Sequence, residues 1–302
     1  MVKNFALIFP GQGIQRVGMG KEIYEKFPQA KQTLDEACEI LGRPLKQIMF
    51  EGPPEELSKI VNTQLSIFTL NIMILNSIKD ALSRKPLFVA GHSLGEFCAV
   101  FASGALSFHD TLKLVEIRGT IMDAFTPEGS MAAVIGLPPE EVQEKAKEIT
   151  STGKLVEAVN FNSTKQTVIS GTKEGIEEFK SKVKARVIPL RVRGPFHSSL
   201  MIGVEKKFQE ELKKFYFSDP DVPVVSNYSA NASKTSEEVV ENLSRQIAAP
   251  VRWVDSVKFM VENGVHLFIE SSEKSILLSM VKDIAPDVNC VNALSLISSG
   301  EK

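Results

Sequence analysis

Short apolar runs alternate along the chain with longer amphipathic stretches. The runs FALIF (5–9), PLFVA (86–90) and HLFIE (266–270) are bounded by turn residues, as buried strands are. Between them, residues 63–82 and 107–125 carry apolar side chains at helical spacing. Strands that alternate with helices in this way predict an α/β fold, with a mainly parallel sheet covered by helices on both faces.

The pattern changes between residues 127 and 198. There it predicts, in order, the strand MAAVIG, the helix PPEEVQEKAKEI, the strands LVEAVNF and QTVISG, the helix KEGIEEFKSKVK and the strand RVIPLRV. A βαββαβ order is typical of ferredoxin-like domains. We therefore expect a ferredoxin-like small domain at 127–198, inserted into a hydrolase-like α/β domain made of residues 1–126 and 199–302.

Composition narrows the possible functions. The chain has 302 residues, 43% of them hydrophobic and 24% charged, and a formal net charge of −2. Basic clusters are two or three residues long at most, so we expect neither nucleic acid nor a membrane surface as a partner. Cys38, Cys98 and Cys290 are far apart and form no C-x-x-C, which argues against disulfides and a zinc site. Because no apolar run reaches about eighteen residues, we expect a soluble protein of the reducing cytoplasm.

The stretch FVAGHSLGEFC, residues 88–98, contains a serine between two glycines. A G-x-S-x-G pattern is weak evidence by itself, since average glycine and serine usage produces it by chance. Here an apolar strand precedes the serine, and LGEFCAVFASGAL follows with helical spacing, which is the order of a nucleophile elbow. The context favours Ser93 as a nucleophile over an ordinary loop serine. It also makes the backbone N–H of Leu94 a candidate donor to an oxyanion.

A serine nucleophile needs a base, and the chain has four histidines. His92 neighbours the serine and should point away from it, His109 precedes a predicted helix, and His266 begins an apolar strand. His197, in RGPFHSSLM, follows the last strand of the small domain, where the chain returns to the main domain. It can therefore overhang the carboxyl ends of the parallel strands, where ligands of open α/β sheets bind. We predict His197 as the base.

The glycine-rich segment FPGQGIQRVGMG, residues 9–20, follows the first predicted strand and suggests a dinucleotide site. Its glycines, at positions 11, 13, 18 and 20, do not have the G-x-G-x-x-G spacing that such sites use. We therefore interpret this segment as a second wall of the serine site.

Six motifs occur in order over nearly the whole chain: FPGQGIQ, GHSLGEF, LVEIRG, NFNS, GPFHSSLM and RQIAAPVRW. Together they resemble the malonyl-CoA:acyl carrier protein transacylase family. The resemblance implies a ping-pong reaction of fatty acid synthesis, in which Ser93 takes malonyl from coenzyme A and passes it to the phosphopantetheine thiol of acyl carrier protein. His197 would act as base and then as acid. The resemblance further implies no metal and no cofactor, because the coenzyme A thioester is a substrate, and we expect a monomer.

Other site residues follow from the resemblance alone. An oxyanion hole would come from the backbone N–H groups of Gln12 and Leu94. The main-chain carbonyl of Gln246 would orient His197 in place of an acid. Arg118, in LVEIRG, corresponds to the family's carboxylate-binding arginine. Without the resemblance, it would be interpreted as an ordinary surface arginine of a helix.

The resemblance also marks positions near the family's pocket, namely Gln64, Asn160, Asn162 and Phe196. For the three polar residues, hydrogen bonding at strand edges and turns is an open alternative. Phe196 precedes the predicted base as it does in malonyl-selective relatives, and simple core packing is the alternative there. Where the family often has a G-P-G-K turn, this chain reads IESSEKSIL, so the turn geometry at 271–274 is not predicted.

Two other functions fit parts of the pattern. Serine esterases and thioesterases share G-x-S-x-G, but they place an Asp or Glu and then a His after the serine, and no acid stands out here. A non-catalytic scaffold that binds a carrier protein would not need the serine, the histidine and the arginine together. Arg186, Arg191 and Arg193 are candidates for contact with an acidic carrier protein, although exposed charges often have no specific role.

Overall fold

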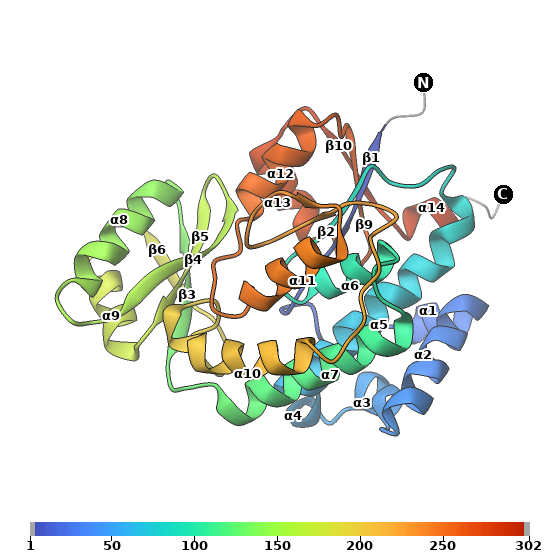
Figure 1. Cartoon of the computed structure of the whole chain (residues 1–302). Coiled ribbons are helices and arrows are strands. Elements are labelled where there is room, and N and C mark those ends of the chain that lie inside the picture. The colour runs from blue at the N-terminus through green and yellow to red at the C-terminus, as the bar shows by residue number, and fades with distance from the viewer. Residues whose placement is uncertain (1–3, 299–302) are drawn as a thin grey trace.

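The computed structural model describes residues 4–298, which fold around two sheets (Figure 1). Sheet A has the strand order β10-β9-β1-β2-β7-β8, and sheet B has the order β4-β5-β3-β6. The strands of sheet A are β1 (Phe5–Phe9), β2 (Phe88–Gly91), β7 (Val224–Val225), β8 (Ala232–Ser233), β9 (Leu267–Glu270) and β10 (Asn289–Asn292). Those of sheet B are β3 (Ser130–Ile135), β4 (Val156–Ser163), β5 (Gln166–Gly171) and β6 (Arg186–Pro189).

Helices connect these strands. Those before sheet B are α1 (Lys21–Lys26), α2 (Pro28–Leu41), α3 (Leu45–Phe50), α4 (Pro54–Leu57), α5 (Ile60–Ile78), the 3₁₀ helix η1 (Lys79–Ala81), α6 (Gly95–Ala102) and α7 (Phe108–Phe125). Sheet B carries α8 (Pro139–Thr150) and α9 (Lys173–Lys182). Those after it are the 3₁₀ helix η2 (Ser199–Met201), α10 (Ile202–Leu212), α11 (Ser236–Arg245), α12 (Trp253–Glu262), α13 (Leu277–Ile284) and α14 (Ser295–Ser298).

Sheet A is parallel except for its edge strand β8, which pairs antiparallel with β7. Its central strand β1 is buried over its whole length. Because side chains alternate between the two faces of a strand, Leu7 and Phe9 join the core beneath α2, α5 and α6, whereas Ala6 and Ile8 join the core beneath α12 and α13. The expected α/β architecture, with helices on both faces of a mainly parallel sheet, is confirmed.

Several predicted elements differ from the structure at their ends. The helix expected over 63–82 begins earlier, at Ile60, and its α-helical part ends at Ile78. The early start has a physical cause, because the carboxylate of Asp123 on α7 accepts hydrogen bonds from the first amides of α5, those of Ile60 (3.0 Å) and Val61 (2.9 Å). The strand expected over 86–90 runs instead from Phe88 to Gly91.

Sheet B has the βαββαβ connectivity and the strand order of a ferredoxin-like domain, as the sequence predicts. In Figure 1 it lies with α8 and α9 at one side of the molecule. Ala132 and Val134 on β3 face the core beneath these two helices, whereas Met131 and Ala133 join the core of the larger domain. Since one face of sheet B is continuous with the larger core, the domain boundaries at 126/127 and 198/199 stay predictions.

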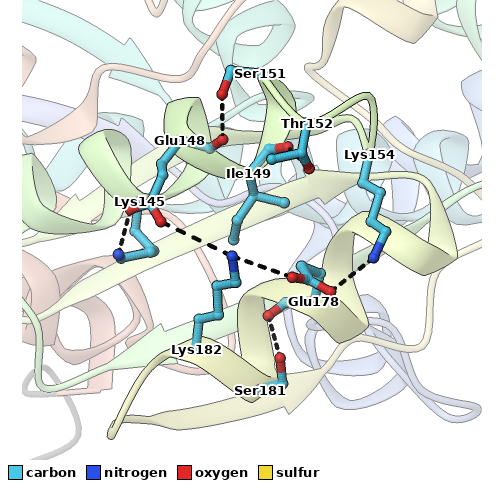
Figure 2. A network of polar contacts seen from close by, with 9 residues as sticks. All are labelled: Lys145, Glu148, Ile149, Ser151, Thr152, Lys154, Glu178, Ser181 and Lys182. Carbon is cyan, nitrogen blue, oxygen red and sulfur yellow. Dashed lines mark hydrogen bonds and ion pairs between the residues drawn. The ribbon is translucent and has the colours of Figure 1, made fainter.

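The outer surface of the small domain carries a chain of ion pairs between α8 and α9 (Figure 2). The ammonium of Lys182 lies 3.3 Å from the carboxylate of Glu178 and 4.0 Å from that of Glu148. Lys154 pairs with Glu178 from the other side at 2.8 Å. Exposed pairs of this kind are each worth less than about 1 kcal/mol. The small domain is therefore held together mainly by its apolar core.

Three glycines allow β1, β2 and α6 to meet closely. A Cβ atom on Gly95 would overlap the carbonyl oxygen of Phe9, and one on Gly91 would overlap the backbone of Gly95. A Cβ on Gly11 would overlap the carbonyl oxygen of His92. Since backbone atoms cannot move aside as a flexible side chain can, no larger residue fits at these positions.

The close approach at Gly95 gives a first prediction. Gly95→Ala should lower the free energy of unfolding by at least about 3 kcal/mol, because the added methyl group overlaps a backbone carbonyl of the central strand. Gly203→Ala is the matched control, since Gly203 is exposed in α10 and a methyl group there would meet nothing within 4 Å. The control should be neutral or stabilising by roughly 0.5 kcal/mol. Urea denaturation of both variants measures this, and equal stabilities would contradict the predicted overlap.

Candidate active site

Ser93 lies in the sharp turn between β2 and α6. Its backbone has a φ of 51°, in the left-handed region that non-glycine residues seldom adopt. The side chain of Asn227, which follows β7, holds this turn from both ends. Its Oδ1 accepts from the amide of Ser93 at 2.6 Å, and its Nδ2 donates to the carbonyl of Gly91 at 2.6 Å. A buried amide thus stabilises a strained turn, as strained functional positions require.

His197 contacts the serine directly. Its Nε2 lies 2.8 Å from Ser93 Oγ, and its Nδ1 lies 3.0 Å from the carbonyl oxygen of Gln246 and 3.1 Å from that of Ala249. Since carbonyls only accept hydrogen bonds, Nδ1 carries the proton and Nε2 presents its lone pair to the serine hydroxyl. A hydroxyl hydrogen-bonded to a neutral imidazole is the arrangement of a nucleophile with its base.

Burial keeps this imidazole neutral. Desolvation, followed by the positive charge of Arg118 and the proximity of His92, lowers the pKa of His197 to about 3. The two carbonyls at Nδ1 oppose this shift, but they do not outweigh it. His197 is therefore able to accept a proton at every pH at which the protein would work.

Of the other histidines, none forms a hydrogen bond with Ser93 within residues 4–298, and His109 lies in the first turn of α7 instead of before that helix. The ring of His92 points to the small domain, with Nε2 at 2.8 Å from Asn162 Oδ1 and its ring against Trp253. His109 is exposed and pairs with Asp110 at 3.0 Å. His266 is exposed at the start of β9.

Two backbone amides near the serine are free to bind a ligand. Within residues 4–298, no hydrogen bond uses the amide of Gln12 or that of Leu94. Leu94 stands at the N-terminus of α6, and a Cβ on Gly11 would lie 3.5 Å from its nitrogen. The turn that bears Gln12 therefore packs directly on the elbow. Two unused amides on adjoining turns are candidate donors to an oxyanion.

The segment at 271–274, whose geometry the sequence left open, packs against the glycine-rich loop. The carboxylate of Glu273 accepts from the amide of Gly20 at 2.8 Å and pairs with Arg16 at 3.1 Å. Ser271 donates from its hydroxyl to the carbonyl of Asn71 at 2.8 Å, and Asn71 in turn donates to the carbonyl of Pro10 at 3.0 Å. These contacts fix the loop on which Gln12 lies.

Arg118 is buried beside the serine, with only 1% of its surface exposed. Its Nη2 lies 3.5 Å from Ser93 Oγ and 3.1 Å from Gln246 Oε1, and its Cζ lies 5.4 Å from the ring centre of Phe97. Its Nε and Nη1 have no partner in the described part of the chain. Desolvation lowers its pKa to about 10, against the attraction of Glu96, so the guanidinium is charged at neutral pH. A buried cation with two free donor groups is a receptor for an anion.

The helix that carries Arg118 is held tightly against α5. A Cβ on Gly119 would lie 2.6 Å from the Cα of Val61, so the two helix backbones approach closely one residue after the arginine. The Asp123 carboxylate bonds to the first amides of α5 a turn farther along. The position of the guanidinium therefore follows from rigid backbone packing.

The remaining predicted pocket residues make no hydrogen bond to Ser93. Gln64 is buried, with its Nε2 3.3 Å from Met122 Sδ and its Oε1 unpartnered within the described residues. Asn162 bonds to His92 and, through Nδ2, to Gln166 Oε1 at 3.0 Å. Asn160 forms a backbone bridge to Val251. Phe196 is 6% exposed within the main core.

Sequence reasoning missed three residues of the site. Asn227 follows a two-residue strand, Glu96 lies within an apolar helical pattern, and Ala249 contributes only its carbonyl. Glu96 is 1% exposed, and its Oε2 accepts from Gln246 Nε2 at 2.7 Å. A carboxyl group three residues after the serine, in an otherwise apolar helical stretch, was the signal that could have identified it.

The base also borders a cavity of about 500 Å³ where the two domains meet. Its walls come from α8, from the edge strand β4 and from the segment after α11, and its lining residues include Val156, Ala158, Ser199, Ala248 and Pro250.

Among residues 4–298, no group of three or more His, Cys, Asp or Glu side chains is arranged to hold a metal ion. No helix in this part of the chain is long and apolar enough to cross a membrane.

The fold and this serine-histidine pair define an α/β acyltransferase, and the acyl transferase domain family matches residues 6–298. The malonyl CoA-acyl carrier protein transacylase of Bacillus subtilis is 41% identical over 289 residues, which cover 94% of this chain and 91% of that protein. The crystal structure of an acyl carrier protein S-malonyltransferase from Vibrio cholerae has a TM-score of 0.92 and 33% identity, and covers 98% of this chain and 100% of its own. A malonyl-transacylase in complex with its type II PKS acyl-carrier protein also has a TM-score of 0.92, at 35% identity, and covers 98% and 99%. The chain belongs to the malonyl CoA-acyl carrier protein transacylase family.

The role of Asn227 in the turn can be tested. Asn227→Ala should lower the free energy of unfolding by roughly 2–4 kcal/mol, because it leaves the amide of Ser93 and the carbonyl of Gly91 without their buried partner. It should also slow acylation of Ser93 by a serine-directed fluorophosphonate. Asn231→Ala, in the same loop but exposed, is the control and should change neither property. A normal rate of acylation in Asn227→Ala would show that the turn does not need this side chain.

Proposed function

We propose that the protein transfers malonyl from malonyl-CoA to the phosphopantetheine thiol of acyl carrier protein through a malonyl ester on Ser93, and so supplies fatty acid chain elongation. Membership of the family and the names of its relatives support this reaction. The solved complex of a related malonyl-transacylase with its carrier protein supports the choice of acceptor.

The buried guanidinium of Arg118, with two of its nitrogens unpartnered in the described residues, is the observation that carries the proposal. An esterase acting on neutral acyl groups has no use for a buried cation 3.5 Å from its serine, and leaving one there is costly. A malonyl group differs from an acetyl group by one carboxylate. The guanidinium can receive that carboxylate in a two-point contact that pairs Nη2, which faces Ser93, with one of the unpartnered donors Nε and Nη1. This contact holds the other end of the malonyl group against Ser93.

The first half of the reaction transfers malonyl to the enzyme. Ser93 Oγ attacks the thioester carbonyl while His197 Nε2 takes the hydroxyl proton. The oxyanion that forms receives hydrogen bonds from the amides of Gln12 and Leu94. As the carbon–sulfur bond breaks, the imidazolium returns its proton to the sulfur of coenzyme A. The second half repeats these steps with the carrier thiol as nucleophile and Ser93 as leaving group.

The imidazole works without an acidic partner. Two carbonyls, those of Gln246 and Ala249, accept hydrogen bonds from the Nδ1–H group and thereby hold the tautomer and the orientation of the ring. Hydrolases with G-x-S-x-G place a carboxylate at this position instead. The carbonyl pair therefore favours an acyltransferase over the esterase alternative.

The remaining pocket residues have proposed roles that follow their positions. Gln64 lies on α5, packed against Met122 of the arginine helix, with a free Oε1, and it would bind the acyl group. Asn160 and Asn162 lie on β4 and would line the path of the pantetheine arm. Phe196, beside the base, would leave no room for a methyl group on the malonyl carbon.

The proposed chemistry needs no cofactor, because coenzyme A enters as part of the substrate and all proton transfers use His197. We also propose a cytoplasmic location, which the free thiols of Cys38, Cys98 and Cys290 support. Arg186, Arg191 and Arg193 are exposed on and after β6, and their contact with the carrier protein stays a prediction.

Incubation with malonyl-CoA alone tests the covalent step. Intact mass spectrometry should find one malonyl group per chain, and none on Ser93→Ala. His197→Ala should form the ester roughly 10²- to 10⁴-fold more slowly, the usual scale of general base catalysis. His109→Ala is the control and should react at the normal rate, since this histidine is exposed and distant in the fold. An adduct that persists in Ser93→Ala would remove the serine from the mechanism.

Arg118→Ala tests the choice of substrate. It should reduce kcat/KM for malonyl-CoA by about 2–5 kcal/mol of transition-state stabilisation, as for the loss of one partner of a buried charge pair. Acetyl transfer should change little, because acetyl has no carboxylate. Arg118→Lys should retain only part of the malonyl activity, since an ammonium lacks the forked geometry. Arg43→Ala, which removes a partly exposed arginine that pairs with α7, is the control. Equal losses on both substrates would show that Arg118 supports the fold and does not bind the carboxylate.

A further inference from the structure

Arg118 has a charge partner that it does not touch. Gln246 lies between the arginine and Glu96, with its Oε1 accepting from Arg118 Nη2 at 3.1 Å and its Nε2 donating to Glu96 Oε2 at 2.7 Å. Nε2 also donates to the carbonyl of Ser93 at 2.9 Å. Because Nε2 faces two acceptors, Glu96 Oε2 and the Ser93 carbonyl, while Oε1 faces the Arg118 donor, only one orientation of the amide satisfies all three groups. The glutamine therefore links the carboxyl group to the guanidinium.

The three side chains form a nearly solvent-free cluster. Glu96, Arg118 and Gln246 are each 1% exposed. Within residues 4–298, no carboxylate forms a direct ion pair with Arg118. Glu96 is the carboxyl group whose charge acts on the guanidinium, and the glutamine lies between the two. A malonyl carboxylate on the free donors of Arg118 would place a second anion on this one cation. Two carboxylates that share a buried site do not both stay ionised.

We propose that Glu96 is the exchangeable counter-charge of Arg118: it is ionised while no acyl carboxylate is bound to the guanidinium, and it takes up one proton from solvent when such a carboxylate binds. This inference rests on the proposed function, in which Arg118 receives that carboxylate. The proton returns to solvent when the acyl group leaves for the carrier thiol. Glu96 touches neither the substrate nor the reacting atoms, so it is a positioning residue that acts through Gln246 and Arg118.

The surroundings of Glu96 suit a group that changes its protonation state. Burial raises its pKa to about 7, although hydrogen bonds from Gln246, Asn227 and Ser226 and the charge of Arg118 oppose the shift. The Ser226 hydroxyl can donate to the ionised carboxylate or, after rotation, accept from the protonated acid. The carboxyl group therefore has a partner in both states.

The sign of the pH dependence follows from linkage. Protonated Glu96 is the form that tolerates a malonyl carboxylate, and its fraction falls as the pH rises through about 7. Malonyl transfer should then weaken relative to acetyl transfer at higher pH. His197 and His92, whose pKa values are lowered, stay neutral over this range, and Arg118 stays charged. Glu205, on the neighbouring α10, bonds to the amide of Ala248, and its effect is common to both substrates.

The test is the ratio of kcat/KM for malonyl-CoA to that for acetyl-CoA between pH 6.5 and 8.5. Ionisations of coenzyme A are common to both substrates and cancel in this ratio. In the parent enzyme the ratio should fall roughly 20-fold, because the protonated fraction of a group with a pKa of about 7 falls from about three quarters at pH 6.5 to about 3% at pH 8.5. In Glu96→Gln, which keeps an acceptor for Gln246 but cannot ionise, the ratio should be flat. Glu116→Gln is the matched control, since it removes a carboxylate of α7 that faces away from the site and pairs with Arg43 and Lys113.

The parent enzyme alone can overturn the proposal, whatever the folding of the variants. A flat ratio in the parent would do so, as would an unchanged pH dependence in Glu96→Gln or a flat ratio in Glu116→Gln. A second measurement, with a pH indicator in weak buffer at pH 7.5, should show proton uptake when malonyl-CoA acylates the enzyme and none with acetyl-CoA. Arg118→Ala distinguishes a failure of this inference from a failure of the proposed function. If Arg118→Ala loses malonyl selectivity while the parent ratio is flat, the proposed function stands and only the role of Glu96 fails.

Discussion

The turn from β2 into α6 holds a serine in left-handed backbone geometry, and the chemistry proposed here depends on that turn. It forms because no side chain stands at Gly91, Gly95 or Gly11, so that the backbones of β1, β2 and α6 come within direct contact. The strain at Ser93 is then offset by the two hydrogen bonds of Asn227. The same contact sets the free amide of Leu94 beside the Gln12 turn. One steric constraint therefore positions Ser93 together with the two amides that we propose as donors to the oxyanion.

The electrostatics of the site follow from the burial of its side chains. Burial keeps His197 neutral, leaves Arg118 charged but with unused donors, and moves the ionisation of Glu96 into the neutral range. In an exposed site these groups would behave as separate side chains with ordinary pKa values. Here Gln246 joins them, with its main-chain carbonyl on the histidine and its side chain between the two charges. A change in the charge of one of these groups therefore changes the energies of the others through the network.

Much of the fold could be predicted from the sequence, because strands, helices and turns are marked by residues that lie close together in the chain. The strand FALIF coincides with β1, and the βαββαβ rhythm of the small domain matches the observed sheet. Ser93 could be predicted from a strand, a turn and a helix that are contiguous in the chain. Asn227 could not, since its strand has two residues and its partner is 134 residues away. Glu96 stands out locally as a carboxyl group in an apolar helix, but its partner Gln246 is 150 residues away, so its role could not be predicted. The buried state of Arg118 likewise depends on packing, so only the resemblance to a family indicated it.

The bond between Ser93 and His197 spans 104 residues, and the carbonyls that hold the imidazole lie another 49 and 52 residues along the chain. In the sequence, the elements of the small domain lie between Ser93 and His197. Contacts with such long separation in sequence form late, because the entropy of closing the intervening chain must be overcome first. During synthesis, a chain that ends before residue 249 has its serine but lacks a carbonyl that orients its base. The serine, its base and the two carbonyls can therefore come together only when nearly all of the chain has been made.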